Sequence, residues 1–119
     1  MALSVWVRRV QDDPTHNDGT RILVDRVWPR GMRKEDVAHE YWNKDVAPST
    51  ELRKWYGHDP GRFEEFARRY RAELESVAGQ DALRELRDCV RGTRLTLLTA
   101  TKNVEHSQAQ VLADLLDGS

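Results

Sequence analysis

The segment 94–99, which reads Arg-Leu-Thr-Leu-Leu-Thr, constrains the fold more than any other part of the chain. It follows a glycine at position 92, and its leucines occupy both odd and even positions, which point to opposite faces of a strand. A strand that is apolar on both faces needs cover on both sides of its sheet, as is typical of parallel sheets. The segment therefore predicts an interior strand that is parallel to at least one neighbour.

Shorter patterns predict the other strands. Residues 3–10 are rich in strand-forming residues, residues 22–24 form a continuous apolar run, and residues 40–45 are a weaker candidate. Residues 11–20 are almost all turn formers, so they predict an exposed loop between the first two strands.

The second half of the chain has helical patterns. Ser49 predicts the cap of a short helix over residues 50–56, with Gly57 as its left-handed final residue. A last helix is predicted over residues 104–117, where Asn103 is the candidate cap and alanine and leucine side chains share one face.

Two further helices are predicted between these. One begins at Asp59, carries apolar side chains on one face as far as Val77, and ends at Gly79. The other is capped by Asp81. Strands come first, helices follow, and a strand–helix unit closes the chain. This order predicts a small layered α/β fold with a central, mostly parallel sheet of about four short strands packed with helices.

Composition limits the class of protein. A chain of 119 residues has the common size of one domain, so residues 1–119 are predicted to form a single domain. The 19 basic and 20 acidic residues leave a net charge of -1, which argues against a general attraction to nucleic acid or to an anionic membrane. No apolar run could span a bilayer, and the first residues lack the pattern of a secretory signal, so a cytoplasmic location is expected.

The cysteine and histidine content bears on metal and redox chemistry. A single cysteine excludes a disulfide within the chain, and the four histidines lack the paired spacing of metal ligands. We therefore expect neither a disulfide nor a metal site, and no motif identifies an organic cofactor.

Four blocks of residues spread over the chain share a known pattern. They are residues 24–31 (Val-Asp-Arg-Val-Trp-Pro-Arg-Gly), residues 44–49 with 52–55, positions 66, 70, 73 and 74, and residues 97–103. Together they resemble the YeaO-like branch of the domain-of-unknown-function 488 family, whose name reflects the absence of a known activity. Some longer relatives look as if they carry a cysteine and a glutamate where this chain has Thr99 and Thr101. The resemblance therefore does not imply thiol chemistry here.

Cationic side chains stand where two predicted strands end. Arg26 and Arg30 follow the second strand, and Lys102 follows the last one. Ligands of open α/β sheets bind beyond the carboxyl ends of the strands, where helix N-termini attract anions. A lysine close to a helix N-terminus is unfavourable unless an anion lies nearby, although a solvated lysine is an equally simple interpretation. Arg26 alternatively pairs with a buried acid, Asp25 or Asp45, to seal the end of the sheet.

The same pocket would include four further residues. Asp45 or His106 would move a proton, and Ser49 and Asn103 would contact the anion. Each also has a structural interpretation, because Asp45 is a possible partner of Arg26, Ser49 and Asn103 are candidate caps, and His106 could simply be a surface residue. We therefore predict a small anionic ligand, with the reaction type, if any, left open.

Two other functions remain alternatives. The four arginines between positions 62 and 71 suggest a module that associates with nucleic acid, but interleaved glutamates cancel this basic patch. An exposed tryptophan would suit a protein-interaction module, which burial of Trp6 and Trp28 would weaken. The sequence leaves the oligomeric state open.

Overall fold

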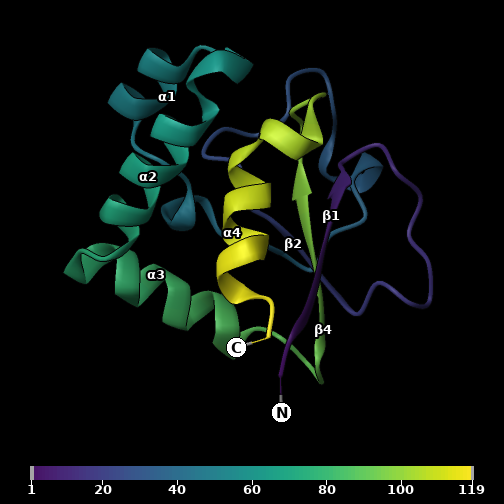
Figure 1. Ribbon diagram of the computed structural model, residues 1–119. Coiled ribbons are helices and arrows are strands. Elements are labelled where there is room, and N and C mark those ends of the chain that lie inside the picture. The colour runs from purple at the N-terminus through teal and green to yellow at the C-terminus, as the bar shows by residue number, and fades with distance from the viewer. Residues whose placement is uncertain (1, 119) are drawn as a thin grey trace.

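A computed structural model describes residues 2–118 and contains a four-stranded sheet in the order β1-β4-β2-β3. The strands are β1 (Ser4–Arg9), β2 (Thr20–Leu23), β3 (Tyr41–Trp42) and β4 (Arg94–Thr99). All neighbouring strands are parallel, and β4 lies between β1 and β2 (Figure 1). The predicted α/β fold and the interior position of residues 94–99 are confirmed.

The central strand β4 joins two cores. Leu95 and Leu97 pack into the larger core, which includes side chains of the helices, whereas Leu98 packs with Leu23 in a smaller core. All three leucines of β4 are fully buried, and burying a side chain of this size contributes about 1.5–3 kcal/mol. Both faces of the strand are therefore covered, as its sequence requires.

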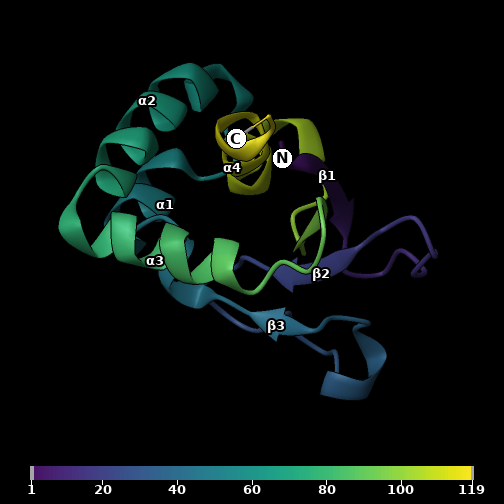
Figure 2. The same cartoon turned by 90° about the horizontal axis from the view of Figure 1, so that it is seen from below.

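The helices are α1 (Thr50–Tyr56), α2 (Phe63–Leu74), α3 (Val77–Asp88) and α4 (Gln108–Leu116), and short 3-10 turns precede α1, α2 and α4. They lie on one side of the sheet, with α4 against β1 and β4 (Figures 1 and 2). On the other side, the connection from β2 to β3 supplies Val37, Trp28 and Met32 to the smaller core. Among the described residues, no helix has the length and apolar character needed to cross a membrane.

The first predicted helix is confirmed in detail. The Ser49 hydroxyl accepts a hydrogen bond from the Leu52 N–H at 3.1 Å, and Gly57 ends α1 with a φ of 55°. Left-handed backbone of this kind favours glycine. Nearby residues therefore determine where α1 begins and ends, and α1 contributes to one wall of the site described below.

The predicted boundary between the two middle helices is wrong. α2 ends at Leu74, and Ser76 rather than Asp81 caps α3 by accepting from the Gly79 N–H at 3.0 Å. Val77 is 81% exposed, so it does not continue the apolar face of α2. Gly79 does not end a helix but lies within α3, where a Cβ would come within 2.6 Å of the Leu74 backbone. The glycine permits this close crossing of the two helices.

The predicted last helix divides into two parts. Residues Val104–His106 form a 3-10 turn, and α4 begins only at Gln108. Its cap is Ser107, whose hydroxyl accepts from the Gln110 N–H, so the assignment of Asn103 as the cap is wrong. The predicted buried stripe of α4, with Ala109 and Leu112, is confirmed.

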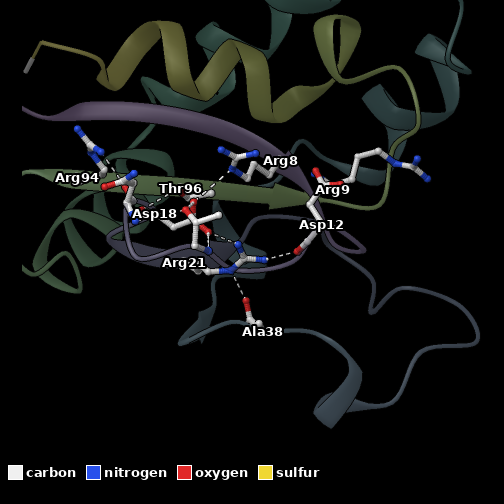
Figure 3. Close-up of polar contacts among 10 residues, drawn as sticks. Arg8, Arg9, Asp12, Asp18, Arg21, Ala38, Arg94 and Thr96 are labelled. Atoms are coloured by element: carbon white, nitrogen blue, oxygen red, sulfur yellow. Dashed lines mark hydrogen bonds and ion pairs between the residues drawn. The ribbon is translucent and has the colours of Figure 1, made fainter.

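Two residues of the predicted exposed loop 11–20 are buried, namely Asp18 and Thr20, the first residue of β2. Asp18 is 1% exposed and forms an ion pair with Arg21 at the start of β2 (Figure 3). Arg21 also donates to the backbone oxygens of Asp12, at 3.1 Å, and Ala38. The pair therefore ties the loop before β2 to the segment that precedes β3.

Candidate functional site

A cleft of about 750 Å³ opens beyond the carboxyl ends of β2 and β4. Its walls come from residues 25–30 after β2, residues 100–108 after β4, and a segment around α1. The carboxyl edge of an open parallel sheet is the usual ligand site in α/β proteins because the connections there diverge. The cleft therefore lies where the strand order predicts a ligand.

The walls of the cleft are strongly cationic. Five arginine or lysine residues line it against one carboxylate, that of Asp25, and two histidines add further nitrogen atoms. The cations are Arg26, Arg30, Arg53, Lys54 and Lys102. Because the whole chain carries a net charge of only -1, this concentration of positive charge is local, and it favours an anion.

The structure brings most of the predicted site residues together. Arg26, Arg30, Lys102, Asn103 and His106 all line the cleft although they come from two separate segments. This arrangement is the one expected if the connections after β2 and β4 share a ligand.

Two predicted residues do not line the cleft. Asp45 lies in a second, smaller hollow of about 400 Å³, whose other carboxylates are Asp81 and Glu85. The Ser49 hydroxyl donates to Glu73 at 2.6 Å while it caps α1, so both its hydrogen and a lone pair are used within the protein. Asp45 therefore belongs to another hollow, and the Ser49 hydroxyl is occupied by contacts within the protein.

Arg26 is held by backbone oxygens rather than by an acid. Its Nε donates to the Pro48 oxygen and its Nη2 to the Ala47 oxygen, both at 3.0 Å. Neither Asp25 nor Asp45 forms an ion pair with it among residues 2–118, so the suggested pairing is not found. The guanidinium is half-buried and oriented by these oxygens, and Arg26 lines both the cleft and the smaller hollow that contains Asp45.

Asp25 forms a polar floor at the end of β2. Its carboxylate accepts from the Thr99 hydroxyl and the Ala100 N–H, both at 2.8 Å, and from Gln108 Nε2 at 2.5 Å. Burial raises the pKa of the Asp25 carboxyl, and these hydrogen bonds oppose the rise. The side chain thus links β2, the end of β4 and the start of α4.

His106 is oriented by two neighbours. Its Nδ1 lies 3.0 Å from Asn103 Oδ1, and its ring packs edge-on against Phe63 with 5.1 Å between ring centroids. His106 therefore lines the cleft with its ring held by Asn103 and Phe63.

Sequence reasoning missed several residues of the cleft. Arg53 and Lys54 on α1 contribute two of the cations, and Gln108 holds the carboxylate of Asp25. The one available signal was the adjacent pair of basic residues on a helix that begins after residue 49. Which face of that short helix meets the sheet edge depends on tertiary packing.

Features that suggested other partners have contacts within the protein. Arg68 and Arg69 both pair with Glu65, with Arg69 Nε at 2.7 Å from the carboxylate. Trp28 is half-buried and donates its indole N–H to the Met32 oxygen, whereas Trp6 is 37% exposed between two arginines. The internal pairs of these arginines argue against a basic patch for nucleic acid, and the partial burial of Trp28 argues against its use as an anchor, whereas Trp6 is not buried.

Among residues 2–118, no group of three or more histidine, cysteine, aspartate or glutamate side chains has a geometry that could hold a metal ion. The described residues that line the cleft supply cations, hydrogen-bond donors, the Asp25 carboxylate and two histidines.

Comparison with known proteins places the chain in a family. A family model described as "Inactive DUF488-N3 subclade" matches residues 4–119. An uncharacterised protein of Mycobacterium tuberculosis is 53% identical over 114 residues, which cover 96% of this chain and 94% of that protein. The uncharacterised protein YeaO of Escherichia coli is 40% identical over 114 residues, which cover 96% of this chain and 97% of YeaO. No solved structure gives a significant match. The chain therefore belongs to the YeaO-like branch of the domain-of-unknown-function 488 family, as its sequence blocks suggested.

Proposed function

We propose that this protein binds a small anionic molecule in the cleft at the carboxyl edge of its sheet. The observation that carries the proposal is the convergence of five cations and one carboxylate from three separate segments of the chain. Scattered surface charges of a nearly neutral protein would not gather in this way around one cavity. A volume of about 750 Å³ suits a metabolite of moderate size.

The cations differ in how they would bind an anion. Arg26 is oriented by the two backbone oxygens that it contacts, so its planar group is positioned before a ligand arrives. Lys102 and Arg53 are exposed, and their long side chains can reach a ligand from two different segments that line the cleft. In this arrangement, Arg26 provides the fixed contact and the exposed cations provide attraction.

We favour binding over catalysis. The matching family model carries the word "inactive" in its description, and of the two predicted proton carriers Asp45 lies in a different hollow, which leaves only His106 in the cleft. His106 and Asn103 then act as hydrogen-bonding partners of the ligand. The protein would work as a sensor or carrier of an anion.

The test is a thermal-shift panel of phosphate, sulfate, small carboxylates and nucleotides at constant ionic strength. A ligand present at one hundred times its dissociation constant stabilises the fold by about 2.7 kcal/mol, which would raise the melting temperature by roughly 10 °C. Lys102→Ala should weaken binding about tenfold or more, because it removes a charge-assisted contact.

Lys34→Ala is the matched control, since Lys34 is also exposed but does not line the cleft. It should leave the affinity unchanged. The proposal fails if no anion raises the melting temperature, or if both lysine variants weaken binding to the same extent.

A further inference from the structure

Among the described residues that line the cleft, Asp25 supplies the single carboxylate beside five cations. This carboxylate affects which anions can bind there. A carboxylate repels an anion at close range unless a hydrogen lies between the two groups. A site that needed only positive charge would be stronger without it. The position of Asp25 therefore suits a ligand that carries a hydrogen-bond donor as well as negative charge.

The hydrogen bonds of Asp25 leave room for one more donor. An ionised carboxylate has about four acceptor positions on its two oxygens. Three donors from residues 2–118 reach it, namely Thr99 and Gln108 at Oδ1 and the Ala100 N–H at Oδ2. The remaining position belongs to Oδ2, and the side chain lines the cleft.

The partners of Asp25 also define its role as an acceptor. The Ala100 N–H and Gln108 Nε2 can only donate, so both oxygens of the Asp25 side chain act as acceptors. These contacts also fix the side chain in place, because Ala100 directly follows β4 and Gln108 is the first residue of α4. A ligand in the cleft thus meets a fixed acceptor among cations.

We propose that Asp25 selects oxyanions that keep a proton on one oxygen near neutral pH, as phosphate does, against those that have none, such as sulfate. The O–H of the bound oxyanion donates to Asp25 Oδ2, while Arg26 and the neighbouring cations bind its charged oxygens. This selection rests on the proposed anion binding and adds the class of ligand.

The experiment compares two ions of similar size and shape. The full chain is titrated with sodium phosphate and with sodium sulfate near neutral pH, at an ionic strength matched with sodium chloride, and apparent dissociation constants are taken from thermal shifts. The protein should bind phosphate at least about tenfold more tightly than sulfate, because a hydrogen bond to a charged group replaces a repulsive contact.

Two variants locate the effect. In Asp25→Asn the ratio of the two dissociation constants should fall to within about threefold, because a neutral carboxamide no longer repels sulfate. Asp45→Asn removes the same charge from a residue of the neighbouring hollow and should leave the ratio unchanged.

The outcomes separate this inference from the proposed function. Equal binding of phosphate and sulfate by the unmodified protein overturns the selection but leaves anion binding standing. Binding of neither ion also overturns the selection, and the proposed function falls with it only if the carboxylates and nucleotides of the panel fail to bind as well. An unchanged ratio in a folded Asp25→Asn protein shows that Asp25 is not the selecting group. If Asp25→Asn does not fold, equal binding of the two ions by the unmodified protein still overturns the selection.

Discussion

Replacing Arg21 with methionine tests the buried ion pair that ties the loop before β2 to the sheet. The Arg21 side chain is 6% exposed and that of Asp18 is 1% exposed (Figure 3). Methionine keeps much of the length and apolar volume of arginine, so the main loss is the charge. Removing one partner of a buried pair costs about 3–5 kcal/mol, because the other charge stays buried without compensation.

The surroundings of the pair place the expected loss at the lower end of that range. Arg8 Nε lies 3.3 Å from Asp18 Oδ1, so the carboxylate keeps one cation in Arg21→Met. The two backbone oxygens that Arg21 leaves belong to Asp12 and Ala38, which are exposed residues that water can reach. We therefore expect a loss of about 3 kcal/mol in the free energy of unfolding. At about 4 °C per kcal/mol for a domain of this size, the melting temperature should fall by roughly 12 °C.

Urea denaturation of three proteins provides the assay. Arg33→Met is the matched control, since Arg33 is 74% exposed in its pairs with Glu35 and Asp36 and should change stability by less than about 0.5 kcal/mol. The double variant Asp18→Asn with Arg21→Met should lose less stability than the sum of the two single variants, because both buried charges of the pair are then removed and only the partly exposed Arg8 loses a partner. A loss below about 1 kcal/mol for Arg21→Met would refute the reasoning, as would strict additivity in the double variant.

Two further predictions concern stability. Burial alone would raise the pKa of the Asp18 carboxyl, but hydrogen bonds from Thr15 and Arg21 lower it below its ordinary value. The lowered pKa stabilises the fold at pH values above the unfolded-state pKa of about 3.9, and this stabilisation is lost as the pH falls below that value. The urea midpoint should therefore fall more steeply with acid in the natural protein than in Asp18→Asn. Parallel curves for the two proteins would contradict this prediction. Gly79→Ala should destabilise the fold by about 1–3 kcal/mol despite the higher helix propensity of alanine, because its Cβ would meet the backbone of Leu74 at 2.6 Å. A thermal melt that shows equal or greater stability would show that α2 and α3 can separate at little cost.

Much of the fold follows from local patterns in the sequence. The leucines of residues 94–99 fall on both faces of a strand, which requires an interior position whatever the neighbours are. Ser49 and Gly57 bound α1 through hydrogen bonding and backbone conformation that involve only nearby residues. Local patterns misplaced the start of α3, because the role of Gly79 depends on a helix that crosses it.

The sequence by itself also determined part of the site. A cation that follows a strand lies near the carboxyl edge of a parallel sheet, so the order of strands and cations along the chain is enough to predict that Arg26, Arg30 and Lys102 lie close to one another. Each of these cations follows its strand by a few residues, so the end of the strand largely fixes where the cation lies.

Only the tertiary structure decided the other parts of the site. Arg53 and Lys54 enter the cleft because α1 packs beside the sheet edge, and Asp45 is excluded because its 3-10 turn faces a different hollow. Asp25 meets Gln108 across 83 positions of sequence, a contact that exists only once β2 and the start of α4 are brought to the same edge. Local patterns indicate which residues share a face of a strand or a helix. Whether that face turns toward the cleft depends on packing between elements that are distant in the chain.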